Sequence, residues 1–92
     1  MQIFVKTCTG KIIPVDCEAN DTIKNLQNKI FQKEGTVPGF QVYIFGGKQL
    51  RDEEKSLVEY NVKKDDTLFL VLRLREKKDD EEVESKESND ED

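Results

Sequence analysis

The fold of this chain is decided by residues 67 to 75, Thr-Leu-Phe-Leu-Val-Leu-Arg-Leu-Arg, the longest run of residues typical of a β-strand. Successive side chains of a strand point to opposite faces, so this run has a leucine face and a mixed face. We expect the leucine face to point toward a core; its members are Leu68, Leu70, Leu72 and Leu74. The mixed face is too apolar for an ordinary solvated surface, which makes it a candidate binding surface; its members are Phe69, Val71, Arg73 and Arg75.

Charge divides the chain into two parts. Residues 1–75 contain 12 Lys/Arg and 10 Asp/Glu, whereas residues 76–92 contain 3 and 10, with Val83 as the single strongly apolar residue. Such a segment buries too little apolar surface to offset the entropy cost of ordering it. We therefore predict one folded domain over residues 1–75, with a small core, and a disordered acidic tail over residues 76–92. The tail is either a solubilising or linking segment or a regulatory or partner-binding tail, and Ser88 lies in an acidic context typical of kinase sites.

The composition also limits the cellular compartment and the classes of partner that we expect. Two cysteines are too few for a disulfide framework, and neither a membrane-spanning run nor a signal-peptide pattern is present. We expect a reducing compartment, that is a cytoplasmic or nuclear location. An acidic balance without any histidine does not suggest a nucleic-acid binder. We expect a monomer that binds neither nucleic acid nor membranes.

The first half of the chain predicts a hairpin followed by a helix. Residues 1–7 and 11–17 alternate as strands around a turn at 9–11. Pro14 lacks a backbone donor, so its strand should lie at a sheet edge. A helix over residues 23–34 is predicted by apolar residues at helical spacing, by an N-cap at Asp21 or Thr22, and by Gly35 as the stop. Phe31 lies off the apolar stripe and either covers the helix flank or contacts a partner.

The second half predicts two further strands before the last one. Residues 40–45 and 48–50 are expected to pair around a turn at Gly46-Gly47, with Tyr43 and Phe45 on one face and Val42 and Ile44 on the other. Residues 57–61 resemble a single helical turn. This order of elements indicates an α+β fold in which one sheet packs on one helix. The last strand can pair in parallel with the first, which leaves the strand containing Pro14 at the edge.

Several stretches closely resemble ubiquitin and its family: residues 1–7, 9–11, 33–35, 47–50, 60–61 and 70–75. The resemblance covers essentially all of residues 1–75. It implies the β-grasp fold, a mixed sheet of about five strands packed on one helix, in agreement with the pattern above.

The resemblance ends where ubiquitin is activated for conjugation. Ubiquitin carries Gly-Gly at the positions that are Glu76 and Lys77 here, and the only Gly-Gly pair of this chain lies in the hairpin turn. Val42 stands where the family has an arginine that looks important for contact with the activating enzyme. Conjugation through the C-terminus is therefore not expected.

Apart from conjugation, the resemblance to ubiquitin implies a surface that binds other proteins. Ubiquitin's recognition patch corresponds to Cys8, Ile44, Phe69 and Val71, bordered by Gly47 and Lys48, and Arg73 matches as well. The alternation alone already placed Ile44, Phe69 and Val71 away from the core. These seven residues are the predicted partner-binding site. The alternative is that they are scattered apolar surface residues without a function.

Other candidate sites are weaker. Lys11, Lys48 and Lys64 match ubiquitin's acceptor lysines, as do Lys6, Lys29 and Lys33, and the alternative is that they are only solvated. Cys17 is expected in the core, and Cys8 in a loop has no histidine to activate it. We predict no catalytic residue, metal site or cofactor, and hence no enzyme.

The leading hypothesis is a ubiquitin-like protein that acts non-covalently through this patch. Its expected partners are proteins with ubiquitin-binding domains, the proteasome, or conjugation and deconjugation machinery. One alternative is a covalent modifier that matures by an unusual route. The other is the ubiquitin-like domain of a longer protein, with the acidic segment as the start of a linker.

Overall fold

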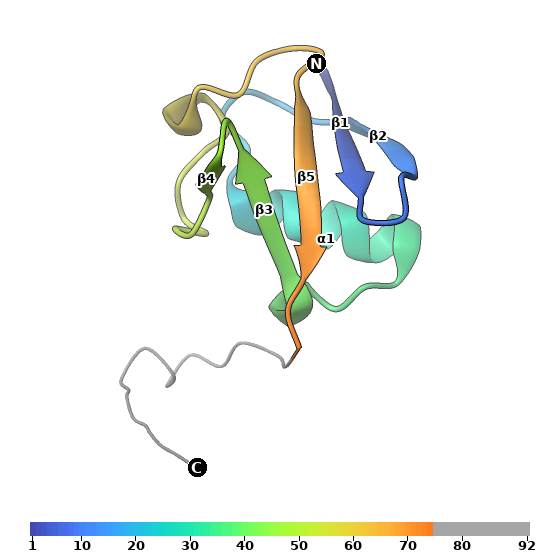
Figure 1. The fold of residues 1–92 in the computed structure, drawn as a ribbon. Helices are drawn as coiled ribbons and strands as arrows, with labels where there is room; N and C mark the ends of the chain where they lie inside the picture. The colour runs from blue at the N-terminus through green and yellow to red at the C-terminus, as the bar shows by residue number, and fades with distance from the viewer. Residues whose placement is uncertain (75–92) are drawn as a thin grey trace, which may run out of the picture.

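The computed structural model describes residues 1–74, and the predicted tail over residues 76–92 lies outside them. Five strands, one α-helix and two short 3₁₀ helices follow one another in the described part (Figure 1). In chain order these are β1 (Gln2–Thr7), β2 (Ile12–Asp16), α1 (Ile23–Glu34), η1 (Pro38–Phe40), β3 (Gln41–Phe45), β4 (Lys48–Gln49), η2 (Val58–Tyr60) and β5 (Thr67–Leu72).

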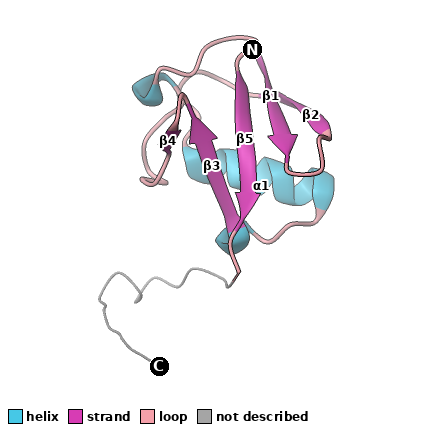
Figure 2. Ribbon diagram, viewed as in Figure 1, coloured by secondary structure: helices cyan, strands magenta, loops and turns pink. Residues whose placement is uncertain are grey.

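The five strands form one mixed sheet in the order β2-β1-β5-β3-β4 (Figure 2). The central pair, β1 and β5, is parallel, and the other neighbours are antiparallel. Helix α1 covers one face of the sheet. The predicted parallel pairing is therefore confirmed, as is the edge position of the strand that contains Pro14. Together these features are the predicted β-grasp fold.

Helix α1 has the boundaries that its terminal signals predict. Thr22 is the N-cap: its hydroxyl accepts a hydrogen bond from the Asn25 backbone N–H, and the Asn25 side chain accepts one from the Thr22 N–H. This reciprocal arrangement satisfies two donors that a helix start otherwise leaves unpaired. Gly35 ends the helix with φ of 80°, a conformation that glycine adopts without strain.

The core lies between α1 and the inner face of the sheet. Its members are the buried apolar residues Ile3, Val5, Ile13, Val15, Cys17, Ile23, Leu26, Ile30, Tyr43, Leu50, Leu57, Val62, Leu68 and Leu70. The predicted inward position of Cys17 is confirmed, as is that of Tyr43, and Phe45 packs against this cluster while only partly buried.

A buried polar chain crosses this core. The Tyr43 hydroxyl donates a hydrogen bond to the Gln41 side-chain oxygen. The Gln41 amide nitrogen in turn donates to the Gln27 carbonyl at 3.0 Å and to the Thr36 carbonyl at 2.9 Å. The chain therefore connects β3 to the helix and to the loop that follows it. Burial raises the pKa of Tyr43 far above its usual range, because the phenolate would lose its hydration.

The prediction for the end of the last strand was partly wrong. Leu68 and Leu70 are in the core, but Leu72 is 49% exposed and Leu74 is fully exposed. The pairing of β5 with β1 reaches only Leu70, and its pairing with β3 ends at Leu72, where the strand itself ends. Leu72 lines a hollow together with Glu34 and Thr36, and Leu74 lies beyond the end of β5, so neither residue is part of the core.

Candidate functional site

The outer face of the sheet carries an unpartnered cluster of apolar side chains. In Figure 1 helix α1 lies behind the sheet, so this face is turned to the viewer. The register places Ile44 opposite Phe69 and Val42 opposite Val71 on the neighbouring strands β3 and β5. Phe69 and Val71 are 49% and 47% exposed, and Val42 and Ile44 are partly buried. We call these four residues the apolar patch.

Alternation placed all four residues on this face, but of these the predicted binding site included only Ile44, Phe69 and Val71. Val42 was left out of that site because it replaces an arginine of the family. As a valine opposite Val71 it adds apolar surface where a charge would have interrupted it. The patch is therefore larger along β3 than the predicted site.

The strand positions beside the patch are polar or basic. Lys6 of β1 stands opposite Phe69, and on its other side opposite Ile12 of β2. Gln49 of β4 stands opposite Ile44. A continuous row thus runs across all five strands, in the order Gln49, Ile44, Phe69, Lys6 and Ile12. The sequence reasoning did not include Lys6 or Gln49 in the site, because cross-strand neighbours are set by register.

Arg73 follows the patch where β5 ends. Its backbone N–H donates to the Phe40 carbonyl at 2.9 Å, which fixes the chain beside β3. The side chain is partly buried, and its Nε lies buried without a hydrogen-bond partner among residues 1–74. A buried donor without a partner carries a desolvation cost, which an incoming acceptor can remove. Arg73 is therefore placed to contribute a charge next to the patch.

Gly47 and Lys48 lie at the tight turn between β3 and β4. Gly46 and Gly47 both have positive φ, 61° and 79°, as a two-residue hairpin turn requires. Lys48 is exposed and stands opposite Phe45, on the other side of the strand from the row that contains Ile44. It therefore lies at the border of the patch and does not contact it through a cross-strand pair.

Cys8 lies apart from the register rows of the patch. It is exposed in the loop between β1 and β2 and lines a hollow of about 200 Å³. Leu70 and Leu72 line the same hollow, and in β5 they alternate with the patch residues Phe69 and Val71. Cys8 therefore shares this hollow with two residues of the leucine face of β5.

The two thiols have different surroundings. Cys17 is buried, and its pKa is raised above the usual thiol value mainly because burial penalises the thiolate. A thiol that stays protonated is a poor nucleophile, which suits a core residue. Cys8 is exposed, but the chain contains no histidine that could serve as its base.

The predicted acceptor lysines differ in their contacts. Lys11 forms an ion pair with Glu34, with Nζ and Oε1 2.8 Å apart. Lys48 and Lys64 are exposed, and neither forms an ion pair within residues 1–74. Both amines are accessible for modification, whereas that of Lys11 must leave its carboxylate partner.

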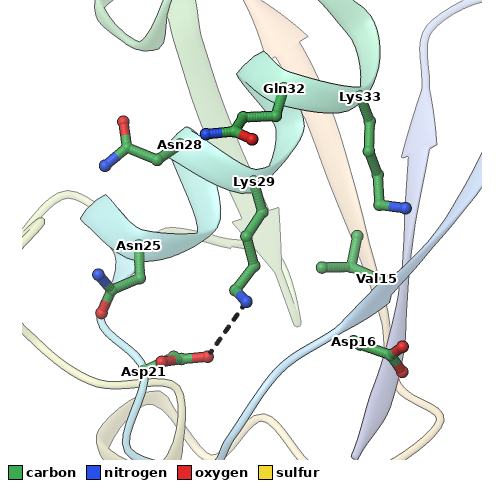
Figure 3. Close-up of a pocket in the computed structure, with 8 residues that line it drawn as sticks. All are labelled: Val15, Asp16, Asp21, Asn25, Asn28, Lys29, Gln32 and Lys33. Carbon is green, nitrogen blue, oxygen red and sulfur yellow. Dashed lines mark ion pairs between the residues drawn. The ribbon is translucent and has the colours of Figure 1, made fainter.

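A polar groove of about 540 Å³ separates α1 from β2 (Figure 3). The Lys29 ammonium lies 4.0 Å from the Asp21 carboxylate at one end, and Lys33 extends toward Val15 and Asp16 at the other. The remaining lining is amide side chains from the exposed face of the helix. The titratable side chains of this groove are Asp16, Asp21, Lys29 and Lys33, and its lining contains no cysteine, serine or histidine.

Residues 1–74 were also considered as a metal-binding or membrane-spanning unit. No group of three or more potential metal-ligating side chains is found in this part of the chain. None of its helices is long and apolar enough to cross a membrane.

Comparison with known proteins agrees with the fold. The ubiquitin family model matches residues 3–75. A ubiquitin-like protein NEDD8 from Dictyostelium discoideum is 44% identical over 75 residues, which cover 82% of this chain and 96% of that protein. A NEDD8-like protein RUB3 from Arabidopsis thaliana is 41% identical over 75 residues, with 82% and 95% covered.

A third relative is far longer. An E3 ubiquitin-protein ligase UPL5 from Arabidopsis thaliana is 37% identical over 76 residues, which cover 82% of this chain but only 9% of that protein. Similar domains thus occur both as nearly whole proteins and within larger ones. The family match over residues 3–75, the relatives at 41–44% identity and the five-stranded sheet on one helix agree. This chain belongs to the ubiquitin family.

Proposed function

We propose that this ubiquitin-like protein acts non-covalently, by docking its apolar patch on other proteins. The observation that carries the proposal is the pairing of Ile44 with Phe69 and of Val42 with Val71 on a sheet face that nothing covers in the described chain. Fully burying one such side chain contributes about 1.5–3 kcal/mol. Because the four are already partly buried, docking yields a weak and reversible complex. Arg73 and Lys48 border the contact.

The partners proposed are proteins of the ubiquitin pathway. Family membership supports ubiquitin-pathway partners in general. Within that class we propose receptors with ubiquitin-binding domains, the proteasome, or the conjugation and deconjugation machinery, reached in the cytoplasm or nucleus by a monomer. We propose no enzymatic activity for the chain itself, since no histidine is present to activate its exposed thiol.

A non-covalent role is favoured over a covalent one by the residues after Arg75. Glu76 and Lys77 stand where a conjugated member of this family carries Gly-Gly. A channel shaped for two glycines excludes a glutamate side chain by its size and by its charge. Membership in a longer protein is the other competing role, and the long relative gives it a precedent. A reading frame that continues past Asp92 would favour it.

The patch is tested by capture on immobilised ubiquitin-binding domains. The full chain is passed over a panel of such domains beside its Ile44→Ala variant, and we expect the variant to lose capture. Val58→Ala is the matched control, because Val58 is a 54% exposed apolar residue that lies in η2, outside the sheet. Capture of Ile44→Ala at the level of the unmodified protein would contradict the proposed role of the apolar patch.

Conjugation is tested separately with an N-terminally tagged copy expressed in its native cells. We expect a single species of the full mass on a denaturing gel. A ladder that disappears when the residues after Arg75 are deleted would show that the C-terminus is activated. A ladder that survives this deletion but is reduced by Lys48→Arg or Lys64→Arg would instead identify those lysines as acceptors.

A further inference from the structure

Charges are unevenly distributed over the outer face of the sheet. The outward strand positions near the patch carry Lys6, and Arg73 follows directly after β5. The one carboxylate at an outward strand position is Asp16, which pairs with Gln2 at the opposite end of β1 from Lys6. Within the described strands, the patch is therefore bordered by positive charge and faces no nearby carboxylate on the same surface.

The chain itself contains a segment of the complementary charge. Residues 76–92 hold ten Asp/Glu and three Lys, a net charge of about −7, whereas residues 1–75 carry a net charge of about +2. The acids are densest at residues 79–82, Asp-Asp-Glu-Glu, and they are followed directly by Val83, the single strongly apolar residue of the segment. An acidic run next to one apolar side chain suits a basic rim around an apolar patch.

From these observations we propose that residues 76–92 bind in cis to the apolar patch and compete there with outside partners. The acids at 79–82 pair with Lys6 and Arg73, and Val83 contacts the patch. This inference rests on the patch of the proposed function and adds a regulator to it. Attraction between exposed charges is weak and screened by salt, so the contact reduces partner affinity without blocking it.

The attachment point makes this contact geometrically accessible. The described chain leaves the sheet at Leu74, beyond the end of β5 and beside the start of β3 (Figure 1). Phe69 lies five residues back along the strand, about 17 Å at a strand's rise per residue. A chain that turned at residues 75–76 would reach Phe69 with about five more residues. Residues 79–82 are therefore tethered within reach of Lys6.

Tethering also sets the size of the effect. A segment joined by a short linker has an effective concentration in the millimolar range at its site. An intrinsic dissociation constant of similar size then lowers the apparent affinity of an outside partner about two- to fivefold. Phosphorylation of Ser85 or Ser88 would add negative charge and strengthen the competition.

The test uses the full chain and needs no outside partner. Backbone amide NMR spectra are compared between the unmodified chain and the variant Asp79→Asn/Asp80→Asn/Glu81→Gln/Glu82→Gln, at about 20 mM and about 300 mM salt. We expect the amides of Lys6, Ile44, Phe69 and Val71 to differ between the two proteins at low salt and to coincide at high salt. Differences confined to residues 72–92 at low salt would overturn the proposal.

Two lysine variants of the full chain separate a specific contact from general charge attraction. Lys6→Gln should reduce the low-salt differences, because Lys6 stands beside Phe69. Lys24→Gln is the matched control, since Lys24 is an exposed lysine on α1, on the other side of the sheet. An equal loss in both variants would contradict binding at the patch.

Partner binding distinguishes failure of this proposal from failure of the proposed function. If an immobilised ubiquitin-binding domain binds the four-acid variant about two- to fivefold more tightly than the unmodified chain at low salt, both proposals are supported. Equal binding of the two proteins overturns the cis contact alone. Absence of binding by either protein overturns the proposed function, while the NMR comparison still decides the cis contact.

Discussion

Ile44 of β3 stands directly opposite Phe69 of β5, and the two side chains share the sheet face away from the helix. Directly opposite side chains of antiparallel strands are about 5 Å apart at Cβ and contact each other. Their neighbours along the strands, Tyr43 and Leu70, are buried in the core. One pair of strands thus supplies both the core and the surface, and the two functions alternate residue by residue.

This alternation predicts that binding and stability respond to different residues of the same strand. Phe69→Ser should weaken binding to a ubiquitin-binding domain about tenfold or more, the equivalent of about 1.4 kcal/mol. Its free energy of unfolding should fall by less than about 1 kcal/mol, because half of the Phe69 side chain is already exposed. Calorimetric titration measures the first quantity and urea denaturation the second.

The control for this prediction is the preceding residue. Leu68 is fully buried, so Leu68→Ala should lower the free energy of unfolding by about 2–5 kcal/mol. Equal destabilisation by the two substitutions would mean that Phe69 belongs to the core, and the patch would then lose its central residue.

The sequence predicted those features that depend on local signals. Thr22 and Gly35 determine the ends of the helix through their own hydrogen bonds and backbone angles, so residues 23–34 could be named before the structure. Pro14 could be placed at an edge because its missing donor excludes a central strand. The outward position of Ile44 and Phe69 followed from alternation alone, which requires only that the strands form.

Features that depend on neighbours distant in sequence could not be predicted in the same way. Alternation assigned Leu72 to the core, but it does not show that the pairing of β5 with β1 ends at Leu70. Cys8 matched a patch position by resemblance, but its place beside a hollow lined by Leu70 and Leu72 could not be predicted from alternation, because Cys8 lies in a loop. Lys6 became part of the site only through the parallel register that sets it opposite Phe69.

The burial of Cys17 and the exposure of Cys8 predict selective alkylation. In the native protein at about pH 8, near the usual thiol pKa, iodoacetamide should modify Cys8 alone. The rate of Cys17 should be at most about one hundredth of the Cys8 rate, because the chain must open before the reagent reaches Cys17. Its raised pKa slows the reaction further, since the thiolate is the nucleophile.

Intact-mass analysis over time follows this reaction. Cys8→Ser is the matched variant, which should remain unmodified in the folded state and gain one adduct in urea. Rapid labelling of Cys8→Ser without denaturant would show that the β2 end of the core is open, in contradiction to the burial of Cys17.

The buried hydrogen bond from Tyr43 to Gln41 predicts how stability depends on alkaline pH. Tyr43 keeps its proton in the folded state, whereas in the unfolded chain it titrates near its ordinary pKa of about 10. Above that value the unfolded state binds fewer protons than the folded state, so raising the pH favours unfolding. The free energy of unfolding should therefore fall by up to about 1.4 kcal/mol per pH unit above pH 10 because of this group alone.

Tyr43→Phe isolates this contribution. Near neutral pH the variant should be less stable by about 1–3 kcal/mol, because the Gln41 side-chain oxygen loses its donor inside the core. Above pH 10 its stability should fall less steeply than that of the unmodified protein, so the two curves should approach each other. Urea denaturation from pH 7 to pH 11.5 measures both. Parallel curves above pH 10 would mean that the Tyr43 hydroxyl reaches water in the folded state, and the buried polar chain from β3 to the helix would not be intact.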